Sequence, residues 1–271
     1  MTTATFSIRS LSLIAQNTLR EAVRQRVFGF LLLLALGLVL GVHFFQEFNF
    51  GTPELRFIAD LGFGAIGLLG AVLAVTATAQ LFFSELENRT VLTLLAKPLG
   101  HAEFVLGKFL GAAAVTGLFC GMLTLLLAAV LWSRETTLMR DYPEAFANGQ
   151  AVNYRQLAIT GGLLWLKLTV LGSLTLLVAS YARTALFTTT TGALVFLICH
   201  LQPFAQDAAA RSDSALVRTT VRLLGWIFPN FQLFSPAAAG GEYLIRVTGY
   251  ALAYVAAACA LATFSFRRRE L

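Results

Sequence analysis

A glycine–lysine pair occurs once in this chain, at Gly107–Lys108, and the residues around it bear on nucleotide binding. A phosphate-binding loop has a glycine five positions before the glycine of such a pair and a hydroxyl residue directly after the lysine. Its backbone amides hold phosphate, and its hydroxyl holds magnesium. Ala102 and Phe109 occupy those two positions here. The sequence therefore predicts that this chain itself binds neither ATP nor another cofactor.

Residues that could hold a metal or act as nucleophiles are few and scattered. The cysteines show no CxxC spacing, and the histidines fall in separate segments: Cys120, Cys199, Cys259, His43, His101 and His200. Cys199–His200 is an adjacent pair, but the sequence places no further ligand beside it. An intramembrane enzyme or redox subunit would need such groups in clusters. The sequence thus predicts neither a metal site nor an enzyme.

Composition indicates a membrane protein. The 271 residues are 57% hydrophobic and 13% charged, whereas soluble domains average about 25% charged residues. So few polar side chains would leave the surface of a soluble protein uncovered, while apolar residues that face lipid need no polar cover. We expect a single polytopic, all-α transmembrane domain over residues 1–271.

Six long uncharged runs, interrupted only by Lys167, predict six transmembrane helices. Each reaches the ~20 residues that a helix needs to cross ~30 Å of hydrocarbon, and a helix bonds all of its own backbone groups there. Glycines in and beside the runs, such as Gly70, Gly107 and Gly111, predict close helix packing. The runs are Val27–Gln46, Leu61–Ser84, Phe109–Ser133, Gln156–Ala182, Thr184–Gln206 and Val247–Phe266.

A further uncharged run, Leu223–Gly241, is predicted not to span the membrane. Pro229 and Pro236 lie inside it, and Gly240–Gly241 closes it. Each proline would remove a backbone hydrogen bond in lipid, where no water can replace it. We interpret the run as a re-entrant or interfacial segment in an outer loop at 207–246.

The charge distribution predicts the orientation. Six spans place both termini on one side of the membrane. Several arginines precede the first span, and Arg267–Arg269 follow the last one. Because basic residues beside spans favour the cytoplasmic side, we expect both termini to be cytoplasmic.

Residues 7–26 are predicted to form an amphipathic helix. Apolar side chains recur every three to five positions, while Arg20, Glu21 and Arg24 lie elsewhere around the helix and Arg26 follows. We favour a helix that lies on the inner leaflet with its arginines near anionic head groups. A plain cytoplasmic helix packed on the protein's own loops is the alternative.

The predicted first cytoplasmic loop, 85–108, is a candidate docking site. Its middle, Val91–Ala96, is apolar and predicts a short amphipathic helix that ends at Pro98 and Gly100. A charged, preformed segment of this kind is suited to docking another protein. A solvated loop that merely connects two spans fits the same spacing equally well.

Lys167 lies deep in the fourth predicted span, ~17 Å from its outer boundary at helical rise. A charge at the bilayer centre costs at least ~2.5 kcal/mol unless it faces protein or water. Two interpretations carry equal weight. Lys167 faces a cavity between two copies of the chain, or it snorkels or pairs with a neighbouring helix.

These motifs together resemble the permeases of type 2 ABC exporters, and they are most similar to the permease group associated with multicopper-enzyme maturation. The resemblance covers nearly the whole chain. It rests on the acidic pair, Arg-Thr and Lys-Pro-Leu-Gly of the 85–108 loop, on Leu19–Phe28, on Phe228–Phe234 and on the basic C-terminal end. It implies an elbow helix before six spans, and a location in the bacterial cytoplasmic (inner) membrane.

The resemblance also implies partners. The 85–108 loop would form a coupling helix in a groove of a separate ATPase subunit, which would bind ATP and magnesium. Two permease copies, identical or paralogous, would join two ATPase subunits. The residues expected to contact the ATPase are Glu85, Glu87, Asn88, Arg89 and Thr90; those that close the loop are Lys97, Pro98, Leu99 and Gly100; and those that flank it from the elbow helix are Arg20, Glu21, Arg24 and Arg26.

The predicted function is that of a permease subunit that couples ATP hydrolysis by its partner to export of a substrate. A non-transport membrane anchor or assembly subunit, docking a cytoplasmic partner through the same loop, is the alternative. Membrane lipid is an expected partner in both cases, and nucleic acid is not. The phenylalanine-rich spans suit a hydrophobic or lipid-like cargo.

Overall fold

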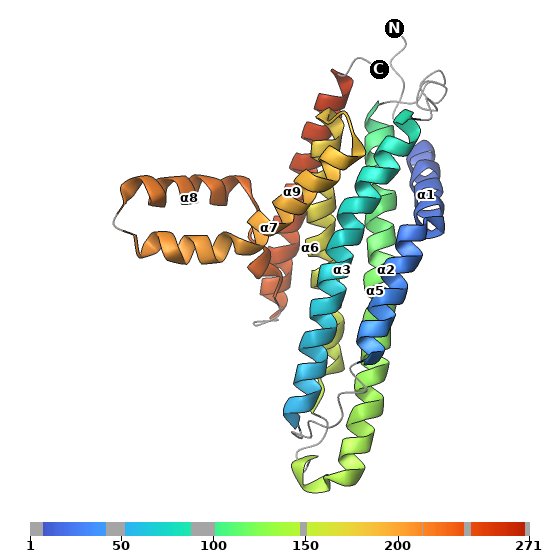
Figure 1. The fold of residues 1–271 in the computed structure, drawn as a ribbon, viewed down its shortest axis with the longest axis vertical. Helices are drawn as coiled ribbons and strands as arrows, with labels where there is room; N and C mark the ends of the chain where they lie inside the picture. The colour runs from blue at the N-terminus through green and yellow to red at the C-terminus, as the bar shows by residue number, and fades with distance from the viewer. Residues whose placement is uncertain are drawn as a thin grey trace.

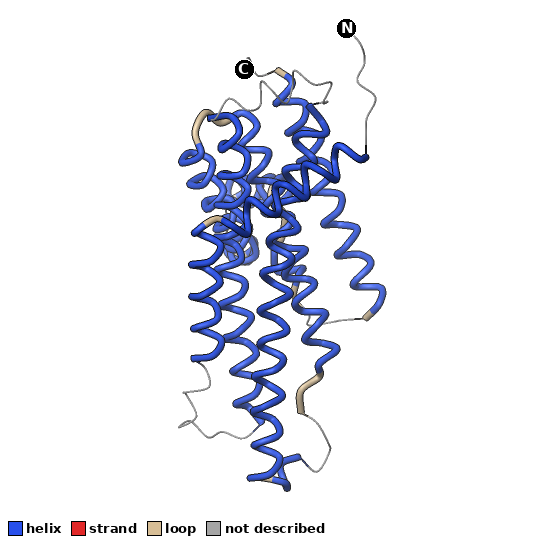
Figure 2. The backbone as a smooth tube through the Cα atoms, turned by 90° about the vertical axis from the view of Figure 1, so that its right-hand side faces the viewer, coloured by secondary structure: helices blue, strands red, loops and turns tan. Residues whose placement is uncertain are grey.

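The computed structural model describes residues 8–41, 52–87, 101–146, 151–212, 214–235 and 240–268. Within these ranges every regular element is helical, and Figure 2 shows no strand. The prediction of an all-α fold is therefore confirmed. The helices are α1 (Ile8–Arg24), α2 (Arg26–Gly41), α3 (Thr52–Glu87), α5 (His101–Asp141), α6 (Tyr154–Tyr181), α7 (Ala185–Ala210), α8 (Ala215–Ile227) and α9 (Gly241–Arg267), with 3-10 turns η2 (Pro143–Phe146) and η3 (Phe231–Phe234).

The described parts of the predicted membrane-spanning runs lie in observed helices, and residues 42–46 of the first run lie outside the described residues. Among the described residues, α3, α5, α6, α7 and α9 are each long and apolar enough to cross a membrane. α1 and α2 meet that requirement together, with a bend of 62° between them, so the described ranges hold five such helices, or six if the bent pair is one span. The chain is thus a polytopic helical membrane protein, as its composition indicated.

The long helices form a bundle, and at one of its ends α3 and α9 end and α5 begins (Figure 1). We call this the terminal end and the opposite one the distal end. α3 and α5 have 36 and 41 residues, or ~54 and ~60 Å at helical rise, nearly twice the thickness of the hydrocarbon core. Both helices therefore continue past the predicted span boundaries into segments that carry charge.

One part of the structure leaves the bundle. The C-terminal part of α7 and α8 form a hairpin that projects sideways (Figure 1). Pro203 lies inside α7, where a proline removes a backbone hydrogen bond and permits a bend. Gln202 Nε2 donates a hydrogen bond to the Gly225 carbonyl oxygen at 3.2 Å, which joins the two arms.

The predicted re-entrant run divides into two parts. Its first residues, up to Ile227, belong to α8, and the helix ends before Pro229. The chain then enters the bundle at η3, where Phe231 and Phe234 are buried, and the Asn230 N–H donates to the Tyr250 hydroxyl oxygen at 3.0 Å. Because Tyr250 lies ~13 Å along α9 from its first residue, η3 reaches into the bundle rather than across it.

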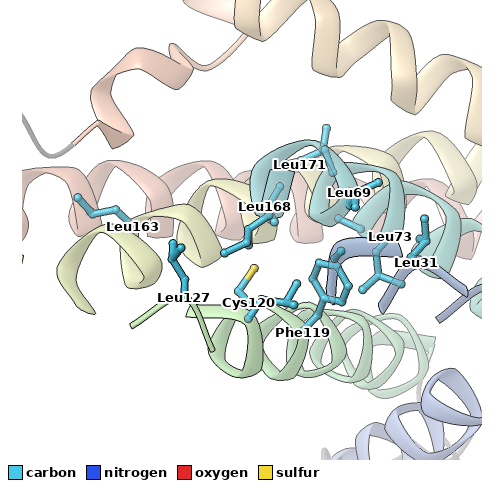
Figure 3. Packing of buried hydrophobic residues seen from close by; sticks show 14 of the residues in the cluster. Leu31, Leu69, Leu73, Phe119, Cys120, Leu127, Leu163, Leu168 and Leu171 are labelled. Carbon is cyan, nitrogen blue, oxygen red and sulfur yellow. The ribbon is translucent and has the colours of Figure 1, made fainter. Parts of the chain in front are cut away.

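The core of the bundle is aliphatic and tightly packed. Figure 3 shows side chains of α2, α3, α5 and α6 that point toward one another, among them Phe119, Leu127 and Leu168, each 0% exposed. A Cβ at Gly70 would lie 2.6 Å from Leu168 Cδ1. This glycine therefore permits the close approach of α3 and α6 that the sequence predicted.

Charged residues hold α3, α5 and α6 together at the distal end. Arg134 Nε donates to Glu54 Oε1 at 2.7 Å, and both side chains are buried. Glu135, 1% exposed, accepts hydrogen bonds from the backbone N–H groups of Ala151 and Val152 and from the Tyr154 hydroxyl. The first contact joins α3 to α5, and the second group joins α5 to the start of α6.

Candidate functional site

The two roots of the predicted docking loop lie at the terminal end of the bundle. α3 ends at Glu87, with Glu85 in its last turn, and α5 begins at His101. The remaining predicted ATPase-contact and loop residues lie outside the described residues: Asn88, Arg89, Thr90, Lys97, Pro98, Leu99 and Gly100. The described part of the site therefore consists of the helices that hold the loop.

A cluster of phenylalanines joins the loop roots to the last helix. The Phe82 ring of α3 lies 6.0 Å from the Phe104 ring of α5 and 5.6 Å from the Phe266 ring of α9. Phe104 and Phe266 are stacked with their centroids 5.5 Å apart. All three side chains are nearly fully buried. Since aromatic rings in such contact pack as one rigid unit, movement of either root is resisted by α9.

Glu21 of the elbow helix joins the same two roots by polar contacts. Its Oε1 accepts a hydrogen bond from the Ser84 hydroxyl of α3 at 3.0 Å. Its Oε2 lies 3.6 Å from Lys108 Nζ of α5, and the Lys108 side chain is 2% exposed. One carboxylate thus ties α1 to the end of α3 and to the start of α5.

Two glycines let α1 lie directly on α5. A Cβ at Gly107 would come within 2.6 Å of Ile14 Cγ2, and a Cβ at Gly111 would clash with Thr18. The sequence predicted close packing at both glycines but did not identify α1 as the neighbour. Glycine at both positions is needed for backbone contact at this spacing.

Among the described residues, the elbow arginines make no comparable contacts with the bundle. Arg20, Arg24 and Arg26 are exposed, whereas Glu21 is half-buried. α1 therefore has one face on α5 and presents its arginines to the surroundings. This arrangement agrees with an amphipathic helix, and the prediction that the arginines lie at anionic head groups stays a prediction.

The arrangement at the loop roots connects four helices mechanically. Within the described ranges there is no group of three or more His, Cys, Asp or Glu side chains that could hold a metal ion. Instead, α1, α3, α5 and α9 converge on the loop roots through the phenylalanine cluster and Glu21. A force applied at the loop would act on all four helices together.

A family model described as "ABC-2 family transporter protein" matches residues 12–271. The chain belongs to the ABC-2 transporter family. Comparison with individual curated proteins gives no match. The chain is accordingly a membrane permease component of an ABC transporter, a kind of subunit that is not itself catalytic. The finer resemblance, to the multicopper-enzyme-maturation group, stays a prediction.

The elbow helix α1, both loop roots and the phenylalanine cluster form what we call the terminal-end junction. The family match begins within α1 and continues through α9, so it includes this junction. ABC-2 permeases work with an ABC ATPase, and the loop held by α3 and α5 is the part of this chain predicted to meet it.

Lys167 lies apart from this junction. It is half-buried on α6, and its Nζ lies over the Phe231 ring, 5.2 Å from the centroid. In the single chain it lines a pocket formed by α3, α6 and η3. The sequence identified Lys167 as an unusual charge but did not predict η3 as its neighbour.

Proposed function

We propose that this ABC-2 permease exports a substrate across the bacterial inner membrane, driven by a separate ATPase subunit that seats on the 85–108 loop. That subunit binds ATP and magnesium, and two permease copies form the transport path. Both termini and the loop then face the cytoplasm. The observation that supports this proposal most directly is the joining of α1, α3, α5 and α9 around the loop roots.

The long helices suit such coupling. α3 and α5 are continuous from the loop roots to the distal end, where Glu54 and Arg134 join them again. A pair of helices joined at both ends moves as a unit instead of bending locally. Closure of two ATPase subunits would therefore tilt this pair and change access to the transport path.

The proposal is tested by reversing the acidic pair of the α3 root. The full chain is co-expressed with the ATPase encoded beside it, and the ATPase is recovered through a tag on the permease. Glu85→Lys with Glu87→Lys is expected to abolish recovery while membrane insertion stays normal, because a cationic α3 root would repel the groove that accepts it. Asp141→Lys with Glu144→Lys makes the same charge change at the distal end and is expected to leave recovery intact.

Undiminished recovery with the reversed root, or labelling of residues 88–100 from outside the cell, would contradict the docking role. A membrane anchor that uses the same loop would recover the ATPase equally well. Its ATPase rate would not respond to any candidate substrate, whereas a transporter's rate would rise.

A further inference from the structure

A pocket of about 620 Å³ lies between α3, α6 and η3, in the distal half of the bundle. This volume falls in the range of pockets that hold small organic ligands. Phe63, Leu164, Phe231 and Phe234 give it aromatic and aliphatic walls. One chain forms all of these walls, so a single copy is sufficient to make the pocket.

The interior of the pocket carries a positive charge. Lys167 lines it ~20 Å along α6 from Tyr154, and its Nζ lies over the Phe231 ring. No carboxylate in the described part of the chain forms an ion pair with Lys167. The ring face offsets part of the cost of removing an ammonium from water, but it supplies no oxygen acceptor for the three N–H donors.

The other charged side chains on the pocket lining, Arg56 and Asp60, lie near the distal end, and their opposite charges cancel. Arg56 Nε is 4.0 Å from Asp60 Oδ2, with the two side chains 88% and 78% exposed. Water and salt screen such an exposed pair. Lys167 therefore gives the lining an excess of one positive charge, located among apolar walls.

We propose that this pocket binds an anionic amphiphile, with one carboxylate or phosphate head on Lys167 and an alkyl chain between Phe63, Leu164 and Phe231. An anionic oxygen supplies the acceptor that the aromatic ring lacks, and the low dielectric of the pocket strengthens the contact. The apolar walls favour a chain over a small ion, because the chain removes their surface from water. The amphiphile's role as the transported substrate rests on the proposed function; its binding to the pocket does not.

The experiment uses the full chain purified in an uncharged maltoside detergent. The probe is dodecanoate with a diazirine in its chain, and cross-linked peptides are mapped by mass spectrometry. Cross-links are expected in residues 55–64 and 153–167 and at η3. A trimethylammonium analogue with the same chain and diazirine is expected to label these segments at least tenfold less.

Variants separate the head-group contact from general binding. Lys167→Met is expected to weaken probe binding about tenfold or more, since it removes a charge-assisted hydrogen bond, while Lys167→Arg retains most of the binding. Arg155→Met removes an exposed charge from the same helix, outside the pocket lining, and is expected to bind the probe normally.

Competition identifies the ligand chemistry. Dodecanoate and dodecyl phosphate are expected to displace the probe, and inorganic phosphate at the same concentration is not. Equal labelling by the cationic analogue, an equal loss of binding in Arg155→Met, or displacement by inorganic phosphate alone would each overturn the inference. So would cross-links confined to residues outside the three segments.

The two proposals fail separately. Recovery of the ATPase without pocket labelling would refute the amphiphile site and leave the docking role standing. Pocket labelling without ATPase recovery would support the site as a lipid-binding pocket and refute the coupling role.

Discussion

The ion pair between Glu54 and Arg134 yields the sharpest prediction about stability. The Arg134 Nε to Glu54 Oε1 distance is 2.7 Å, and the two side chains are 11% and 8% exposed. Glu54 Oε2 is buried without a hydrogen-bond partner, so Arg134 is the group that neutralises the Glu54 carboxylate. Removal of the arginine alone leaves a buried charge without its partner.

Arg134→Met is therefore expected to lower the free energy of unfolding by about 3–5 kcal/mol, the usual cost of breaking a buried pair from one side. Glu54→Leu combined with Arg134→Met removes both charges and replaces them with apolar side chains. The double variant is expected to recover at least ~2 kcal/mol of that loss, because no uncompensated charge remains.

The measurement is reversible unfolding in mixed micelles, followed by tryptophan fluorescence as the denaturing detergent fraction rises. Arg246→Met is the matched control, since it breaks the exposed pair between Arg246 and Glu242. That change is expected to cost less than about 1 kcal/mol. A loss below ~1 kcal/mol for Arg134→Met, or a double variant no more stable than the single one, would refute the reasoning.

Two further changes test the terminal-end junction. Gly107→Leu is expected to displace α1, because the added side chain must occupy the space of Ile14. Cysteine cross-linking between α1 and α5 measures this displacement. Gly121→Leu is the control and should leave the cross-linking unchanged, since a Cβ at Gly121 meets nothing within 4 Å. Phe104→Ala is expected to lower the free energy of unfolding by about 3–5 kcal/mol and to reduce substrate-stimulated ATPase activity more than ATPase recovery. Equal stimulation with this variant would show that the stack on Phe266 does not transmit motion.

Much of the helical architecture was predictable because its causes are local. A run of about 20 apolar residues that must satisfy its own backbone in lipid has to be a helix, and the described parts of the long runs lie in helices of the structure. The break between α8 and η3 was predictable too, since Pro229 has no backbone N–H to continue a helix there.

The lengths of α3 and α5 were less predictable. The sequence suggested that their spans end at the first charges, but both helices continue through charged residues. Glu54 and Arg134 can be buried there because they neutralise each other across the helix pair, and that compensation cannot be seen in either segment by itself.

The sequence by itself determined the class of the protein, because its hydropathy made it a membrane helix bundle. It also led to the prediction that ATP hydrolysis belongs to another subunit. The tertiary structure decided which groups meet. Glu21 and Lys108, 87 positions apart, come together because of how α1 and α5 are rotated about their own axes. That rotation depends on the close contact at Gly107 and Gly111. Periodicity shows which face of a helix is apolar, but the neighbour of that face is chosen by the packing of the whole bundle.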